Sequence, residues 1–452
     1  MTSMEPEKRN IENYTIAFHT LGCKVNRYET DAVRQAFASL GFQIVTEETP
    51  ADIVVINTCT VTSEADRKSR QMIRRAKRRN PGAIVVAMGC QIELLKSASD
   101  ADITVGTKNR LSVVDLVLEK MGLPMADPPS TVIKTPSTVI KTPETGYQEF
   151  GPVVSQEDTT RAFVKIQDGC DSFCSYCIIP FARGRVVSRA SAEILREAEE
   201  LSNRGFHEIV LTGIHLCSFG KERGEGIEAL VRLLEQIDDI PSIHRIRLGS
   251  LEPNSMTESF VHRLAGIRKL CPHFHVSLQS GSDSVLSRMN RKYTTKGYRE
   301  VISQLRSVFP RVAVTTDIIV AFPGETEEEH QESLRFCREI GFSRIHVFPF
   351  SVRNGTRAAD MQPKVSSKTA AERTDTFIQL SNSLAAAYCS RFEGDTVDVL
   401  LETKDESGEF SGYSKEYLRV HVSSGQDVRQ GQEVRVKVIS TEQNELYGTV
   451  TY

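Results

Sequence analysis

The sequence has no apolar run of the roughly 18 residues that a membrane-spanning helix needs. Its first residues, MTSMEPEKRNIENY, are polar, so we expect no signal peptide. The chain also has no excess of positive charge, because its formal net charge is −3. Binding of nucleic acid would therefore have to depend on a local basic patch. We therefore expect a cytoplasmic protein, in which thiols stay reduced and grouped cysteines indicate metal or redox chemistry.

Histidine is absent from Phe150 to Phe206, and the cysteines of this stretch are Cys170, Cys174 and Cys177. They are spaced Cys-x3-Cys-x2-Cys in the segment DGCDSFCSYCIIPFARG. A structural zinc site would need a fourth Cys or His close by, so a distorted zinc knuckle is the weaker alternative. Three thiolates with one open position suit a [4Fe–4S] cluster that keeps one iron free for another ligand.

Three further cysteines each follow an apolar run: Cys23 after TIAFHTLG, Cys59 after ADIVVINT and Cys90 after AIVVAMG. If these runs are parallel strands of one sheet, the cysteines lie at its carboxyl edge, where such sheets hold ligands. The alternative is three unrelated buried cysteines. The repeated placement favours a second iron–sulfur cluster bound by these three thiols.

The pattern of apolar runs divides the 452 residues into parts. Residues 14–120 alternate strand-like and helix-like stretches, which is typical of a small α/β domain with a parallel sheet. Residues 159–350 contain six strand-like runs separated by helical segments, which indicates a partial (β/α) barrel with its site at the carboxyl ends of the strands. A helix is expected around 366–389, followed by the short strands of a small β-barrel.

The segment from Pro129 to Thr142 contains PSTVIKT twice in tandem, and we interpret it as part of an extended linker. We predict the following parts: an N-terminal domain at 1–125, the linker at 126–157, a barrel domain at 158–386 and a C-terminal domain at 387–452.

The central motif, with Tyr176 before its last cysteine, resembles that of the radical S-adenosylmethionine (SAM) superfamily. A resemblance to the radical SAM methylthiotransferases extends over nearly the whole chain. It runs through the segments TLGCKVNRYETD, NTCTVT, GCQ, DGCDSFCSYCIIPFARGRVVSR, SLEP, LQSGSDSVLSRMNRKYT, DIIVAFPGET and HVFPFSVRNGT. It implies a flavodoxin-like N-terminal domain, a (β/α)6 radical SAM core and a C-terminal TRAM domain.

The resemblance also implies the cofactors and their roles. Two [4Fe–4S] clusters and SAM are expected, with SAM serving both as methyl donor and as radical source. The central cluster would cleave SAM to a 5′-deoxyadenosyl radical, whereas the N-terminal cluster would carry the sulfur that is methylated and transferred. The cofactors thus perform the attack on an unactivated carbon while the protein positions them.

Other residues are candidates for contacting SAM or substrate at the ends of the barrel strands: Tyr176, Glu252, Gln279 and Gly324. Gly324 lies in AFPGE, where we expect the backbone to approach the cofactor closely, and an ordinary turn glycine is the alternative. Arg183 and Arg185 are candidates for binding a carboxylate or a phosphate, with plain surface arginines as the alternative. The remaining cysteines are expected to be structural: Cys217, Cys271, Cys337 and Cys389.

The family has three branches, which act on isopentenyladenosine in tRNA, on threonylcarbamoyladenosine in tRNA, or on an aspartate of a ribosomal protein. The segment GCKVNRYET around Cys23 is most similar to the threonylcarbamoyladenosine branch. The resemblance therefore implies methylthiolation at C2 of that base at position 37 of tRNA. Isopentenyladenosine is the runner-up substrate, and a non-enzymatic iron–sulfur RNA-binding protein is the alternative from a different class.

The run RKSRQMIRRAKRR, from Arg67 to Arg79, has eight basic residues and no acidic ones. On a helix, side chains such as Arg74 and Arg78 would neutralise RNA phosphates, although many charged runs are only solvated faces.

The C-terminal part is acidic, with twelve acidic and six basic residues over 392–452. If this part binds RNA, it must do so through a local surface or through aromatic side chains such as Tyr413 and Tyr417. The alternative is that it packs against the rest of the enzyme or against a protein. We expect the tRNA anticodon stem-loop and a reducing electron donor as partners, and neither DNA nor a membrane.

Overall fold

The computed structural model describes residues 10–96, 98, 100–108, 110–123, 153, 160–406, 408–423 and 428–451. The tandem PSTVIKT segment and nearly all of the predicted linker lie outside these described residues. The chain forms two compact units: the first is Met1–Gln156, Gly169–Asp171 and Ile178–Arg189, and the second is Glu157–Asp168, Ser172–Cys177 and Ala190–Tyr452. The domain limits proposed from the sequence stay predictions. No helix among the described residues is both long and apolar enough to cross a bilayer.

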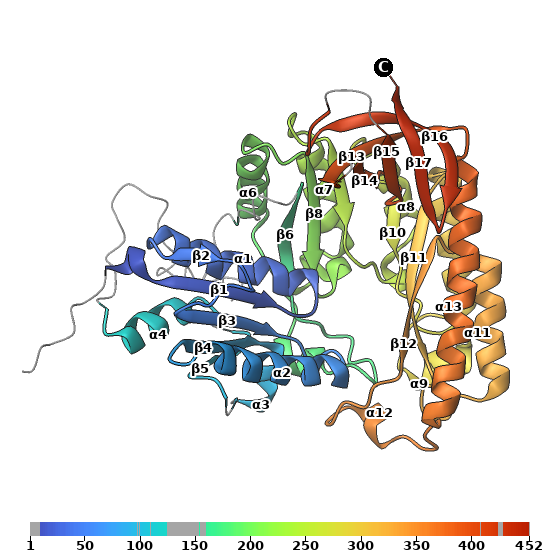
Figure 1. Cartoon of the computed structure of the whole chain (residues 1–452). Coiled ribbons are helices and arrows are strands. Elements are labelled where there is room, and N and C mark those ends of the chain that lie inside the picture. Colours follow the sequence, from blue (N-terminus) through green and yellow to red (C-terminus); the bar gives the residue numbers. More distant parts are fainter. Residues whose placement is uncertain are drawn as a thin grey trace, which may run out of the picture. The chain divides into compact units, whose positions relative to one another are not determined.

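The first unit is built on a parallel sheet of five strands in the order β2-β1-β3-β4-β5 (Figure 1). This is the flavodoxin-like order, so the predicted fold class is confirmed. Every residue of β3 is buried, as expected for a strand covered on both faces. Neighbouring side chains of β1 enter different cores, with Phe18 in one and Ala17 in the other. The elements are β1 (Thr15–Thr20), α1 (Lys24–Ser39), β2 (Gln43–Val45), β3 (Ile53–Thr58), α2 (Ser63–Arg79), β4 (Ile84–Gly89), α3 (Cys90–Leu95), β5 (Ile103–Val105), α4 (Ser112–Met121), α5 (Ile179–Arg183) and β7 (Val187–Ser188).

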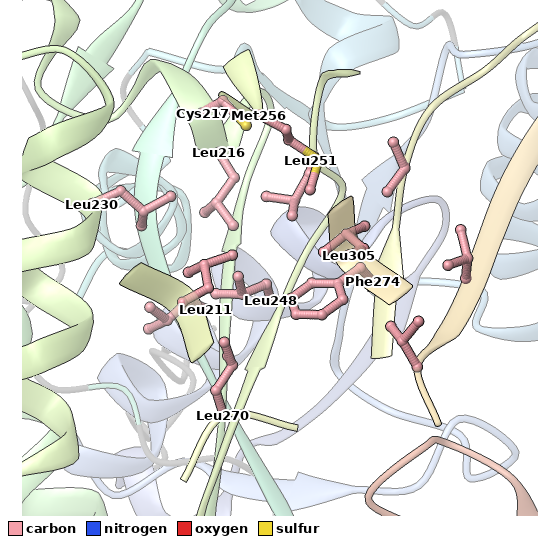
Figure 2. Close-up of a cluster of buried hydrophobic side chains, with 14 of the residues drawn as sticks. Leu211, Leu216, Cys217, Leu230, Leu248, Leu251, Met256, Leu270, Phe274 and Leu305 are labelled. Carbon is pink, nitrogen blue, oxygen red and sulfur yellow. The ribbon is translucent and has the colours of Figure 1, made fainter. Parts of the chain in front are cut away.

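Six parallel strands form the body of the second unit and follow one another in chain order. One set is β6-β8-β9 and the other is β10-β11-β12, and the parallel bridges Ile246–Leu270 and Leu251–Val276 lie between them. Side chains such as Leu211, Leu248 and Phe274 fill the space between strands and helices (Figure 2). The predicted partial (β/α) barrel is therefore confirmed.

The strands of this barrel coincide with the six predicted runs. They are β6 (Arg161–Asp168), β8 (Glu208–Gly213), β9 (Arg245–Leu248), β10 (His273–His275), β11 (Ala313–Val320) and β12 (Arg344–Pro349). The helices are α6 (Ser191–Asn203), α7 (Ile227–Asp238), α8 (Glu258–Ala265), α9 (Asp283–Arg288), α10 (Thr295–Val308), α11 (Glu327–Ile340), α12 (Arg357–Asp360) and α13 (Ser367–Cys389).

The end of the second unit is a small closed barrel in the order β13-β14-β15-β17-β16, as expected for a TRAM-like domain. Its strands are β13 (Thr396–Lys404), β14 (Phe410–Ser414), β15 (Arg419–Ser423), β16 (Glu433–Glu442) and β17 (Glu445–Thr451). Val399, Val420 and Val436 lie in its core.

Buried charges join this small barrel to the amino ends of the larger barrel's strands. Arg247 Nε donates to the Glu208 carboxylate at 2.9 Å, and its Nη1 donates to the carbonyl of Lys415 at 3.1 Å. Arg245 lies 2.8 Å from Glu433. Burial alone would raise the pKa of Glu208, but the neighbouring guanidinium groups, Arg247 first, hold that pKa below its ordinary value. The ionised carboxylate is thus fixed between the two barrels of this unit.

Candidate functional site

Cys23, Cys59 and Cys90 lie at the carboxyl edge of three adjacent strands, where the sequence placed them. Cys59 directly follows β3 and Cys90 directly follows β4, and both are buried, whereas Cys23 is exposed before α1. Gly22 has a φ of 101°, and a Cβ there would lie 2.8 Å from the Sγ of Cys59, so this close approach requires glycine. Across the described residues, no three Cys, His, Asp or Glu side chains are arranged as ligands of one metal ion. The three thiols lie at the same edge of the sheet.

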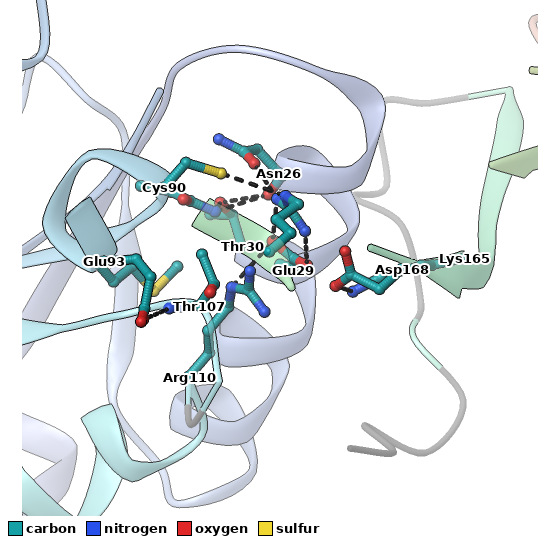
Figure 3. A network of polar contacts seen from close by, with 12 residues as sticks. Asn26, Glu29, Thr30, Cys90, Glu93, Thr107, Arg110, Lys165 and Asp168 are labelled. Carbon is teal, nitrogen blue, oxygen red and sulfur yellow. Dashed lines mark hydrogen bonds and ion pairs between the residues drawn. The ribbon is translucent and has the colours of Figure 1, made fainter. Parts of the chain in front are cut away.

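A buried polar network surrounds Cys90, and Figure 3 shows it together with Asn26, Glu29 and Arg110. Arg183, at the end of α5, donates to both oxygens of the Glu29 carboxylate at 3.0 and 3.2 Å. It also donates from Nη2 to the Asn26 side chain at 2.7 Å and from Nε to the Sγ of Cys90 at 3.3 Å. The side chains of Arg183 and Glu29 have no exposed area. The Arg183 guanidinium thus binds the Glu29 carboxylate in the interior, and the predicted binding of a substrate anion by Arg183 stays a prediction.

The same network fits an anionic group bound by the three thiols. Arg110 Nε lies 3.0 Å from the Glu29 carboxylate, so two buried guanidinium groups contact this one carboxylate. The Nη2 of Arg110 is buried and has no hydrogen-bond partner within the described part of the chain. Burial raises the pKa of the Cys59 thiol to about 11. Burial also raises the pKa of Cys90, although Arg183 opposes the shift. Bound metal would remove these protons, and the nearby guanidinium groups of Arg183 and Arg110 would favour the thiolate of Cys90.

The central cysteines lie on the loop that connects β6 to α5, as predicted. Gly169, just before Cys170, has a φ of 71°, and a Cβ there would lie 1.9 Å from the carbonyl oxygen of Arg185. Only glycine permits this crossing of the two backbones. The amide of Cys177 donates to the carbonyl of Cys174 at 3.0 Å, which closes a tight turn within the motif.

Two residues near this loop were missed by sequence reasoning. Arg291 donates from Nη1 to the Sγ of Cys174 at 3.1 Å, and its Nη2 lies 2.7 Å from the Glu252 carboxylate. His215, just after β8, has its Nε2 4.0 Å from Glu252. Burial lowers the pKa of His215, although Glu252 opposes the shift, so burial favours the neutral imidazole. The position of His215 after a predicted strand was a usable signal. Arg291 follows a short helix, and no pattern in the sequence indicates where it lies.

The other candidate SAM residues lie as follows. Tyr176 packs against a small apolar cluster that includes Met289 and Phe322. Gln279 has a φ of 70°, which is uncommon for a residue other than glycine, and it pairs with β11. Gly324 has a φ of 74°, and a Cβ there would meet only ordinary contacts, so backbone conformation rather than space favours glycine.

The helix α2 presents a basic face, as the sequence predicted. Within the described residues, Arg70 and Arg78 have no acidic partner, whereas Arg74 lies 3.1 Å from Asp100. Arg185, unlike Arg183, is exposed, with Nη1 3.5 Å from Asp171. The basic side chains that line a shallow hollow along α2 are Arg67, Arg70, Arg74, Lys77 and Arg78.

Tyr413 and Tyr417 lie between the two barrels of the second unit. Their rings stack at 4.7 Å, and the guanidinium of Arg161 lies 5.1 and 5.2 Å from the two ring centroids. Arg247 lies 4.6 Å from the centroid of Tyr417. These cation–π contacts engage both rings, which favours the docking alternative over RNA binding by these two side chains.

Comparison with known proteins agrees with this geometry. The sequence profile of the radical SAM superfamily matches residues 164–337, and that described as "Uncharacterized protein family UPF0004" matches residues 15–106. A solved structure of the radical SAM methyltransferase TsrM from Kitasatospora setae superposes with a TM-score of 0.56. It covers 76% of this chain and 77% of that chain at 15% identity, which supports the fold alone.

Relatives are similar over nearly the whole length. The threonylcarbamoyladenosine tRNA methylthiotransferase MtaB of Bacillus subtilis is 39% identical over 94% of both chains. The protein of the same name from Thermotoga maritima is 34% identical over 95% of both chains. The tRNA-2-methylthio-N(6)-dimethylallyladenosine synthase of Alkaliphilus oremlandii is 32% identical over 95% of this chain and 91% of that one. The chain therefore belongs to the radical SAM methylthiotransferases, and this membership confirms the predicted cofactors, SAM and [4Fe–4S] clusters.

Proposed function

We propose that this protein methylthiolates C2 of N6-threonylcarbamoyladenosine at position 37 of tRNA. The observation that carries the choice of base is the 39% identity to a relative named for that substrate, against 32% to one named for dimethylallyladenosine. The segment GCKVNRYET around Cys23 supports the same choice. The isopentenylated base is the alternative substrate.

In this proposal the two sets of cysteines hold the two clusters. Cys170, Cys174 and Cys177 bind the cluster that meets SAM, and the three thiols at the edge of the N-terminal sheet bind the other. When bound, these cofactors supply the radical and the sulfur needed at an unactivated carbon.

The chain's own residues orient these groups. Arg291 holds the Cys174 side chain beside Glu252, so a cluster ligand and a candidate SAM contact are fixed by one guanidinium. Gln279, Tyr176 and Gly324 are the other candidate SAM contacts.

Recognition of the substrate requires a cation and an exposed base. The threonine carboxylate of the modified base needs a cationic partner, and Arg185 is the candidate because it is exposed. The base must leave the anticodon-loop stack to present C2. Arg74 and Arg78 on α2 are candidate contacts to phosphates of the anticodon stem-loop. We place this reaction in the cytoplasm, with a reducing electron donor as second partner.

The deciding experiment compares three tRNAs that are identical except at position 37. They carry threonylcarbamoyladenosine, isopentenyladenosine or unmodified adenosine, and nucleoside mass spectrometry detects the methylthio product. We expect product only with the first tRNA. Product with the isopentenylated tRNA alone would move the protein to the other branch. Failure of the reduced, anaerobic protein to cleave SAM to 5′-deoxyadenosine would instead favour a non-enzymatic iron–sulfur RNA-binding protein.

A further inference from the structure

The loop that follows β11 begins with a strained backbone. Ala321, its first residue, has a φ of 58°, and Gln279, which pairs with Ile318 of β11, has a φ of 70°. A residue other than glycine is strained at positive φ, and such strain persists only where the surrounding structure holds it. The two strained residues thus lie together at the carboxyl ends of barrel strands, where such barrels bind their ligands.

A buried ion pair holds the first residue of this loop. The amide of Ala321 donates to the carboxylate of Glu325. Arg373 Nη1 donates to the same carboxylate at 2.9 Å and to the carbonyl of Glu325 at 3.1 Å. The side chains of Arg373 and Glu325 are 7% and 2% exposed. Since a buried carboxylate without a cationic partner is costly, the acceptor of the Ala321 amide depends on a guanidinium from the distant helix α13.

The other end of the loop has its own attachments. The amide of Gly324 donates to the carbonyl of Pro363 at 2.8 Å. The carbonyl of Gly324 accepts from Arg288 Nη2 at 3.3 Å. Loss of Arg373 would therefore release the Ala321 end of the loop, while these bonds continue to hold the Gly324 end.

We propose that Arg373 is a positioning residue for SAM: through Glu325 it keeps Ala321 in its left-handed conformation and so shapes the loop against which SAM packs. Arg373 acts through Glu325 and is not itself a contact of SAM. This inference rests on the proposed contact between SAM and this loop at Gly324.

The test measures SAM binding by the full chain, reconstituted anaerobically with oxidised clusters so that SAM is bound but not cleaved. Equilibrium dialysis gives the dissociation constant of SAM, and hydrogen exchange with mass spectrometry follows peptides that span Ala321. The variants are Arg373→Met, Arg373→Lys and Glu325→Gln.

Two further variants on α13 are the controls. Lys368→Met removes the charge of a side chain that is 87% exposed. Leu380→Ala leaves a cavity in the hydrophobic core and lowers stability, which separates a general loss of stability from the specific effect. Both controls should bind SAM as the parent does.

We expect Arg373→Met to weaken SAM binding at least fivefold and to speed exchange at Ala321, because the acceptor of that amide loses its partner. Glu325→Gln keeps an oxygen for the amide but loses the ion pair, so it should weaken binding at least twofold. Arg373→Lys keeps the charge and should recover part of the affinity. Ala321→Gly added to Arg373→Met should also restore part of it, because glycine adopts positive φ without strain.

Other results would overturn the inference. One is parent-like SAM affinity in Arg373→Met, and another is an equal loss of affinity in Leu380→Ala. If Arg373→Met does not fold, Glu325→Gln decides instead, and parent-like binding of SAM by that variant overturns the role. If SAM binds to the parent without slowing exchange in this loop, the proposed contact at Gly324 is itself wrong, which is a different failure.

Discussion

Cys174 and Cys59 belong to the two different sets of thiols, and single substitutions should separate their roles. The intact protein is expected to bind about eight irons, as two four-iron clusters, and either Cys→Ala variant about four. Cys174→Ala should no longer form 5′-deoxyadenosine, whereas Cys59→Ala should still cleave SAM but give no methylthiolated tRNA. Iron analysis and chromatography of both products measure this.

Cys389→Ser is the matched control for that experiment. Its Sγ donates to the carbonyl of Asn444 at 3.2 Å, and a serine hydroxyl keeps a donor there. Iron content and both activities should be unchanged. Normal tRNA modification by Cys59→Ala would refute the role of the N-terminal thiols.

The acidity of the N-terminal thiols leads to a pH dependence of iron loading. Burial raises the pKa of Cys59 to about 11, so the metal-free protein holds this thiol protonated at neutral pH. Since only the thiolate binds iron, loading must release protons and should strengthen between about pH 7 and about pH 9. Competition with a chelator, measured on Cys174→Ala at both pH values, tests this. Affinity that does not change with pH would contradict it.

At the residue scale, the sequence predicts where the grouped cysteines lie better than it predicts which side chains surround them. The cysteines were recognisable because each follows an apolar run, and the carboxyl ends of parallel strands meet at one edge. The pairing of Arg183 with Glu29 was missed because Glu29 is distant in the sequence and the pair forms only on folding. Arg291 was missed for the same reason.

Among the elements, α2 offers the most direct test of RNA binding. Arg70→Gln with Arg78→Gln should weaken binding of all tRNAs alike, because phosphates carry no base information. The dependence of binding on salt should also fall, by about 0.7 to 0.9 in the log–log slope for each lost phosphate contact. Binding measured over a range of salt concentrations gives both quantities.

Arg75→Gln on the same helix is the control. Arg75 lines a different hollow, together with Glu47 and Glu48, whose carboxylates repel phosphate. Its substitution should leave the salt dependence nearly unchanged. If Arg75→Gln lowered the salt dependence as much as the Arg70→Gln, Arg78→Gln variant does, the overall positive charge of α2 would attract tRNA, rather than the face that carries Arg70 and Arg78.

The elements that the sequence predicted are those with a strong local signal. Thr326 and Glu329 form a capping box at the start of α11, a local pattern that can be read from the sequence, and the six barrel strands lie where apolar runs were found. β2 and β14 were missed. β2 has three residues and β14 reads FSGYS, so neither has the apolar run or clear alternation that marks a strand, and pairing within their sheets decides their conformation.

For the whole molecule, the buried charges between the two barrels of the second unit are expected to matter for stability. Arg247→Met would leave Glu208 buried without its closest partner, which costs about 3–5 kcal/mol of unfolding free energy. Denaturant unfolding measures this loss. Arg268→Met is the control, since Arg268 is 73% exposed and its ion pair should contribute no more than about 1 kcal/mol. If both variants lost the same unfolding free energy, the buried ion pair would stabilise the protein no more than the exposed one does.

The assignment of Ile178–Arg189 to the first unit has a consequence for chimeras between related proteins. A natural place to join two parents would be the linker, so that one parent supplies the N-terminal domain and the other supplies the rest. Such a crossover would set Arg183 of one parent against Glu29 and Cys90 of the other. In a functional chimera, the segment Ile178–Arg189 must therefore come from the same parent as the N-terminal domain, although the two are separate in the sequence.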